Sequence, residues 1–268
     1  MPAYPVDLVV RYGEHPDQLA DLRLPPAPAR QLHPPSALVL VVHGGFWRQE
    51  YDRHHTDPLA ADLAARGYAV ASVEYRRLGG AGGWPETFDD VATAVDVVPA
   101  LVSSAAPVTV GLPVVLLGHS AGGHLALWAA GRHRLAPDSR WHRTLPTPIG
   151  GVVAIAPVAD LARAADLGLD DSVVEELLGG RGHEWAHRLA QLDPTGLPPA
   201  APVIVVHGAR DRHVPLELGR RYVDAVRTAR ATVTLDVVRD AEHFLLIDPA
   251  SPAWPRVLTA LARVIADT

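Results

Sequence analysis

Residues 113–130 read PVVLLGHSAGGHLALWAA, and this stretch decides the fold. The apolar residues at its start are typical of a buried strand, and the run after Ser120 is typical of a buried helix. Between them lies the pattern G-x-S-x-G, with Gly118 and Gly122 on either side of Ser120. Small residues are needed there because the backbone is crowded at a sharp corner between a strand and a helix. The pattern predicts that the Ser120 hydroxyl is exposed above the sheet at a helix N-terminus, a position that suits a nucleophile.

A nucleophilic serine needs a histidine base and a carboxylate that orients this base. In hydrolases with such a corner, the acid and then the histidine follow the serine along the chain. Residues 202–207 read as a buried strand, and Asp211 in the loop after it is the expected acid. Residues 232–238 read as a second strand, and His243 shortly after it is the expected base. Asp240 is the reserve acid, although its place three residues before His243 is more typical of a turn residue.

The fourth expected part of the site is an oxyanion hole. Residues 37–42 form another apolar run, which leads directly into the sequence HGGFW at 43–47. The glycines of this loop free the backbone to point N–H groups at a developing negative charge. The expected donors come from Gly44, Gly45 and Phe46, and the N–H of Ala121 after the nucleophile is their expected partner. The sequence leaves open which of the three loop residues donates.

Four segments resemble the α/β-hydrolase superfamily in order and spacing: HGGFW at 43–47, GHSAGGH at 118–124, HGARD at 207–211 and HF at 243–244. Within it, the chain resembles the esterase and lipase branch, which includes hormone-sensitive-lipase-like carboxylesterases and kynurenine formamidases. The aromatic ending of the first segment is similar to the formamidase loop rather than to the His-Gly-Gly-Gly loop of the lipase-like enzymes. The resemblance implies the same triad, Ser120, Asp211 and His243, and the same oxyanion donors.

The alternation of strand-like and helix-like segments predicts a single α/β domain over residues 1–268, and the resemblance implies that it has the α/β-hydrolase fold. We expect a mostly parallel sheet of eight strands with helices on both faces and an antiparallel N-terminal hairpin of residues 6–12 and 18–24. The other strands are expected at 38–42, 69–74, 114–117, 151–155, 203–207 and 232–238, and helices at 58–66, 85–103, 121–133, 216–228 and from about 252 to 267. Residues 160–199 break the alternation, and we expect them to form a small lid with helical patches near 170–178 and 183–192.

Composition excludes several kinds of chemistry. The chain has no cysteine and no lysine, which excludes thiol catalysis, Schiff-base catalysis and a serine–lysine dyad. A formal net charge of −6 offers no basic face for nucleic acid or an anionic membrane. There is no leader-like start and no long uncharged apolar run, so a cytoplasmic protein is expected. The 14 histidines lack metal-ligand spacing, and neither a metal nor another cofactor is expected.

The sequence therefore predicts a serine hydrolase that cleaves small carboxylic esters through an acyl-enzyme intermediate. Phe46, Trp47 and Trp84 could line an apolar acyl pocket, although large aromatic residues more often pack in the core, and Trp47, Trp84 and His119 are the expected substrate-binding residues. Arg48 could meet a substrate carboxylate, although an exposed arginine is the simpler interpretation. An arylformamidase that cleaves N-formylkynurenine is the nearest alternative. A peptidase of the prolyl-oligopeptidase-like branch and a non-catalytic ligand-binding protein on the same fold are further alternatives. The expected partner is a small ester or amide, and the protein is expected to be a monomer or a homodimer.

Overall fold

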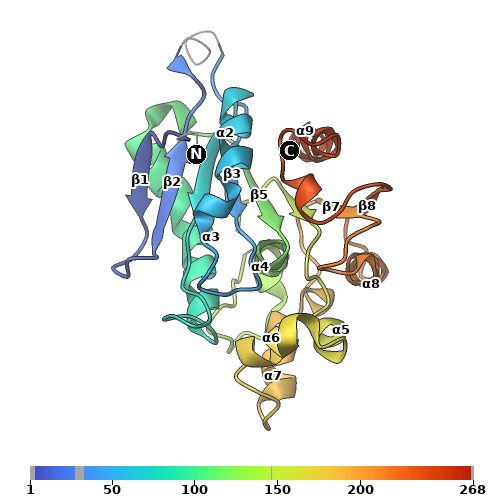
Figure 1. The fold of residues 1–268 in the computed structure, drawn as a ribbon. Helices are drawn as coiled ribbons and strands as arrows, with labels where there is room; N and C mark the ends of the chain where they lie inside the picture. Colours follow the sequence, from blue (N-terminus) through green and yellow to red (C-terminus); the bar gives the residue numbers. More distant parts are fainter. Residues whose placement is uncertain (1–3, 28–32, 146, 267–268) are drawn as a thin grey trace.

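The computed structural model describes residues 4–27, 33–145 and 147–266 (Figure 1). Within these residues, eight strands form one sheet in the order β1-β2-β4-β3-β5-β6-β7-β8. The strands are β1 Leu8–Arg11, β2 Leu19–Arg23, β3 Leu38–Val42, β4 Ala69–Val73, β5 Val114–His119, β6 Gly151–Ile155, β7 Val203–Gly208 and β8 Val233–Val238. Strand β2 runs antiparallel to both of its neighbours, and every other pair in the sheet is parallel. The expected mostly parallel sheet with an antiparallel N-terminal hairpin is confirmed.

Helices cover both faces of this sheet. The main helices are α2 Asp57–Ala65, α3 Glu86–Ala105, α4 Ala121–Gly131, α8 Leu216–Thr228 and α9 Trp254–Ala266. Because successive side chains of a strand point to opposite faces, β3 contributes to two cores. Its residues Leu38, Leu40 and Val42 pack in a core with α3, α4 and α8. Its residues Val39 and Val41 pack in a second core with α2 and α9. The two cores confirm the expected layers.

The segment expected as a lid contains three helices, which lie together at the lower end of Figure 1. Helices α6 Leu169–Leu177 and α7 Trp185–Leu192 match the two expected patches, whereas α5 Leu161–Asp166 was not expected. Helix α5 is too short for a clear periodic pattern, and it begins where the side chain of Asp160 accepts a hydrogen bond from the Arg163 N–H at 2.8 Å. The function of this segment as a lid remains a prediction.

Short 3₁₀ helices complete the secondary structure: η1 Arg53–Thr56, η2 Pro107–Thr109, η3 Arg132–Arg134, η4 Pro194–Gly196 and η5 Phe244–Leu246. The expected helix over 121–133 therefore ends earlier, at Gly131, and continues as η3. No helix within the described ranges has the length and apolar character needed to cross a membrane. Since β3, β5, β7 and β8 are parallel, the loops after these strands meet at one edge of the sheet, and they carry the candidate residues.

Candidate active site

Ser120 lies at the corner between β5 and α4, with a left-handed backbone (φ 57°) and only 2% of its surface exposed. The corner is tight because the two glycines of the motif let main chains approach closely. A Cβ atom at Gly122 would lie 2.1 Å from the carbonyl oxygen of Val42, and one at Gly118 would lie 2.2 Å from that of Gly122. The Ser120 N–H donates to the carbonyl of Ile155 at 2.8 Å, which ties the corner to β6. Packing, rather than glycine's tolerance of positive φ, thus explains both glycines.

The structure brings Asp211 and His243 together. Asp211 follows β7 and His243 follows the neighbouring β8, and the Nδ1 of His243 lies 2.6 Å from the Oδ2 of Asp211. The other oxygen, Oδ1, accepts hydrogen bonds from the N–H groups of His213 (2.9 Å) and Val214 (2.8 Å). Because a carboxylate only accepts, Nδ1 carries the ring proton, and this leaves Nε2 of His243 as a proton acceptor.

The Asp211 carboxylate is stabilised in its charged form. Burial by itself raises the pKa of Asp211, but the hydrogen bonds from His207 and His243 outweigh burial and hold this pKa well below its usual range. The side chains of Asp211 and His243 are almost entirely buried. An ionised, buried carboxylate can both orient His243 and stabilise a positive charge on its ring.

A pocket of about 350 Å³ opens beside these residues. It is lined by Gly45, Phe46, Arg48, Glu50, Tyr51, His55, His119, Ser120, Asp170, His213, His243 and Phe244. Ser120 and His243 thus line one pocket, although 123 positions separate them along the chain. The Ser120 hydroxyl has no hydrogen-bond partner within the described part of the chain, and in enzymes without substrate such catalytic contacts often tighten only when substrate binds.

The loop after β3 approaches the nucleophile closely. A Cβ atom at Gly44 would lie 3.0 Å from the Cβ of Ser120, and Gly45 (φ 102°) and Phe46 (φ 50°) both have left-handed backbones. The N–H groups of Gly44, Gly45, Phe46 and Ala121 make no hydrogen bond to any described residue. Unpaired N–H groups beside a nucleophile can donate to an oxyanion. The structure therefore brings together the four residues expected to supply donors, and their role remains a prediction.

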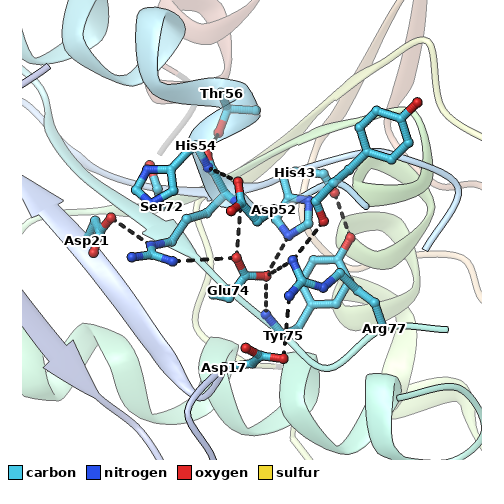
Figure 2. A network of polar contacts seen from close by, with 12 residues as sticks. Asp17, Asp21, His43, Asp52, His54, Thr56, Ser72, Glu74, Tyr75 and Arg77 are labelled. Atoms are coloured by element: carbon cyan, nitrogen blue, oxygen red, sulfur yellow. Dashed lines mark hydrogen bonds and ion pairs between the residues drawn. The ribbon is translucent and has the colours of Figure 1, made fainter. Parts of the chain in front are cut away.

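A buried network of ionic contacts includes His43, the first residue of this loop. Figure 2 shows Glu74 between His43, Tyr75 and Arg77. The Oε1 of Glu74 lies 2.9 Å from the His43 Nε2, and it accepts from the Tyr75 N–H (3.0 Å) and the Arg77 Nη1 (2.7 Å). Its Oε2 accepts from the N–H of Arg53 at 2.9 Å. Burial raises the pKa of Glu74, but the hydrogen bond and charge of His43 and the charge of Arg77 outweigh it and lower the pKa from 4.5 to about 2.

Sequence reasoning missed Glu74, although a signal was present, since an acidic residue ends the apolar run at 69–74. Such a position, at the carboxyl end of a buried strand, is where parallel sheets place functional groups.

His119 is fully buried and lines the pocket, as expected. Its ring centroid lies 4.5 Å from that of His243, and neither of its ring nitrogens has a hydrogen-bond partner among the described residues. Burial lowers the pKa of His119 well below its usual value, and the charges of His243 and His55 lower it further. The contact of His119 with a substrate remains a prediction.

The structure corrects the expectation for two tryptophans. Trp47 has 0% of its surface exposed and packs in the core, with its ring 5.3 Å from that of His124. Trp84 lines a separate hollow, where its ring lies 4.9 Å from that of Trp141 and beneath the Arg188 guanidinium. Burial of a large aromatic surface stabilises both positions. Of the aromatic residues considered for the acyl pocket, it is Phe46 that lines the pocket.

Arg48 connects this pocket to helix α6. Its Nε donates to the Asp170 carboxylate (2.8 Å), its Nη2 to the Asp170 carbonyl (3.2 Å) and its Nη1 to Glu176 (3.0 Å). All three nitrogens of the guanidinium thus donate hydrogen bonds to other residues of the chain. Sequence reasoning missed Asp170 as a pocket residue, because it lies 122 positions from Arg48 and no local pattern marks it. It likewise missed Tyr51, His55 and His213.

Comparisons with known proteins find a hydrolase family and relatives described as esterases. The family model described as BD-FAE matches residues 21–225. The esterase LipC of Mycobacterium tuberculosis is 29% identical over 256 residues, which cover 90% of this chain and 60% of LipC. The probable carboxylic ester hydrolase LipM of the same organism is 27% identical over 241 residues, which cover 84% of this chain and 52% of LipM. The chain thus spans about half to three-fifths of the length of these two relatives.

The fold is similar to that of solved esterase structures. A structure of esterase B from Lactobacillus rhamnosis inhibited by a tributyrin phosphonate superposes with a TM-score of 0.77 at 21% identity, covering 96% of this chain and 84% of that chain. At this level of identity the likeness is one of fold.

Proposed function

The chain belongs to the BD-FAE family, a hydrolase family of the α/β-hydrolase superfamily, and we propose that it hydrolyses small carboxylic esters with Ser120 as nucleophile, His243 as base and Asp211 as orienting acid. The observation that carries this proposal is the 2.6 Å contact between His243 and Asp211 at a pocket that Ser120 also lines. The similarity to the esterase LipC supports the ester as the bond that is cleaved.

In the proposed mechanism, the Oγ of Ser120 attacks the ester carbonyl carbon while the Nε2 of His243 takes the hydroxyl proton. The N–H groups of the 44–46 loop and of Ala121 donate to the resulting oxyanion. The alcohol then departs with the proton from His243, and an acyl group remains on Ser120. A water molecule, deprotonated by the same histidine, attacks this acyl-enzyme. The Oγ of Ser120 then leaves with the proton from His243, and the carboxylic acid is released.

The substitution Ser120→Ala tests the nucleophile. We expect the variant to fold, because alanine keeps the Cβ and the N–H bond to Ile155, and to lose hydrolysis of p-nitrophenyl butyrate by at least about 10³-fold. A fluorophosphonate probe should label the wild-type protein at Ser120 and leave the variant unlabelled. Turnover at the wild-type rate by the variant would reject the nucleophile. A wild-type protein that neither turns over nor reacts with the probe would favour a ligand-binding protein instead.

Arylformamidase activity is the second candidate, favoured by Phe46 in the pocket beside the two loop glycines. N-formylkynurenine carries a carboxylate, and Arg48 is the arginine that lines this pocket. Since its guanidinium is already bonded to Asp170 and Glu176, a substrate carboxylate would have to displace them. We therefore expect a higher kcat/KM for p-nitrophenyl butyrate than for N-formylkynurenine, and the reverse order would assign the enzyme as a formamidase.

A further inference from the structure

His43, the first residue of the loop at 43–47, has two hydrogen-bond partners that can only accept. Its Nδ1 lies 2.8 Å from the carbonyl oxygen of Gly44, and its Nε2 lies 2.9 Å from the Oε1 of Glu74. The His43 side chain has no exposed surface, and the Glu74 carboxylate is almost as buried. A carbonyl and an ionised carboxylate carry no hydrogen to donate. Each ring nitrogen must therefore supply the proton of its own hydrogen bond.

A neutral imidazole has only one N–H group. If His43 were neutral, a nitrogen lone pair would face an oxygen lone pair at hydrogen-bond distance in either tautomer. A rotation of the ring by half a turn would place carbon atoms against both oxygens and lose both bonds. The contacts are satisfied only when both nitrogens are protonated, which makes the ring an imidazolium.

The surrounding charges are arranged around one carboxylate. Glu74 supplies the negative charge opposite His43. The cations Arg77 and Arg53 bind the same carboxylate at 2.7 and 3.6 Å, and they in turn pair with Asp17 and Asp21.

Tyr75 packs against the other side of His43. The rings of His43 and Tyr75 are stacked with centroids 4.4 Å apart, and the Tyr75 hydroxyl donates to the His43 carbonyl at 2.8 Å. A flat aromatic face beside a cation is an attractive contact. His43 thus contacts Glu74 at the edge of its ring and Tyr75 at the face of its ring, and both contacts oppose a rotation of the ring away from Gly44.

We propose that His43 is a buried imidazolium that strengthens the oxyanion hole through the peptide group between Gly44 and Gly45, with Glu74 as its counter-ion. The carbonyl that accepts from the His43 Nδ1 belongs to the same peptide group as the Gly45 N–H, and Gly45 lines the pocket. A charged donor on the carbonyl polarises this group and makes its N–H a stronger donor. His43 and Glu74 are positioning residues in this scheme, which rests on the proposed esterase function.

Nuclear magnetic resonance of wild-type protein labelled with ¹⁵N-histidine tests the charge directly. We expect one imidazole with protons on both nitrogens, and its signals should vanish in His43→Gln. A single proton on the His43 ring would overturn the proposal. The measurement needs no enzyme activity, so it separates a failure of this proposal from a failure of the proposed function, which the fluorophosphonate probe reports on its own.

The substitution Glu74→Gln tests the consequence. An amide keeps the size of the side chain but removes the counter-ion, and we expect kcat for p-nitrophenyl butyrate to fall about 10- to 100-fold with KM nearly unchanged. Complete removal of one oxyanion-hole donor lowers kcat by about 10²–10³-fold. We expect a smaller decrease here, because the Gly45 N–H becomes a weaker donor but is still present. Affinity for butylboronic acid, whose adduct with serine is a tetrahedral anion, should fall by a similar factor.

Asp90→Asn is the matched control. Asp90 is an equally buried carboxylate, and its hydrogen bonds within the described residues are to Arg76 and Gln18 and not to the 43–47 loop. We expect this variant to lose stability while keeping its kcat and boronic acid affinity. Equal losses of kcat in both variants, or an unchanged boronic acid affinity in folded Glu74→Gln, would reject the link between His43 and the oxyanion hole.

Discussion

Replacing Asp211 by asparagine should stop the reaction without unfolding the protein. The oxygen of the new amide must face the N–H groups of His213 and Val214, because both are donors at 2.8–2.9 Å. The amide NH₂ then faces the Nδ1 of His243, where the carboxylate oxygen lay at 2.6 Å. Two donors cannot bond, so His243 changes tautomer, accepts at Nδ1 and carries its proton on Nε2. In this tautomer it cannot take the proton of Ser120.

The expected size of the effect follows from this change of tautomer. A base in the wrong tautomer, with the geometry otherwise kept, lowers kcat about 10⁴-fold. This corresponds to about 5 kcal/mol of lost transition-state stabilisation. The stability should change far less, since the amide oxygen keeps both backbone hydrogen bonds and the side chain keeps its volume. KM should stay within a few-fold of the wild-type value, because Asp211 lies behind His243 and does not line the pocket.

Initial rates with p-nitrophenyl butyrate and urea unfolding curves measure the two quantities. Asp240→Asn is the control, because this second acid of the same loop region is 72% exposed and pairs with Arg210 at 2.8 Å. It should behave as wild type. A folded Asp211→Asn variant that keeps more than a tenth of the wild-type kcat, or a large loss in Asp240→Asn, would refute the tautomer argument.

Two further predictions concern the surroundings of the site. Arg48→Ala removes the bonds to Asp170 and Glu176, so hydrogen exchange at the start of α6 should speed up and KM should rise, with a stability loss below about 1 kcal/mol because the pairs are partly exposed. Arg181→Ala, which removes the pair with Glu175 and the contact with the Trp185 ring, should change neither the exchange there nor KM, and equal exchange in both variants would contradict the role of Arg48. The pKa of Glu74 is lowered from 4.5 to about 2 in the folded protein, so the unfolded chain binds the proton first, and about 3 kcal/mol of stability is lost as the pH falls from about 4.5 to about 2. Urea unfolding at several pH values should show that the free energy of unfolding falls less steeply with acid in Glu74→Gln than in the wild type. Identical slopes in both proteins would rule this contribution out.

Much of the fold could be read from local patterns. The parallel strands, the corner at Ser120 and the antiparallel hairpin follow from apolar runs and turn residues a few positions apart, and such patterns act over one element. The order of Ser120, Asp211 and His243 was equally readable, because parallel strands place their following loops at one edge of the sheet. Helix α5 was missed since it has only six residues and depends on the Asp160 cap.

Contacts between distant parts of the chain could not be read in this way. The order of residues in the HGGFW loop does not reveal that Phe46 faces the pocket while Trp47 packs in the core, because the left-handed backbone of both residues sets the direction of the side chains. The pairs Arg48–Asp170 and His43–Glu74 join residues 122 and 31 positions apart.

The amino-acid order alone accounts for the layers of this protein and for the residue types at its candidate active site, because hydrophobic periodicity and corner geometry are local properties. The folded chain decides which atoms of those residues come into contact. These contacts in turn decide which ring nitrogens of His43 and His243 carry a proton. A histidine at position 43 is visible in the sequence, but the charge that we propose for it arises from two acceptors that only packing brings to its ring.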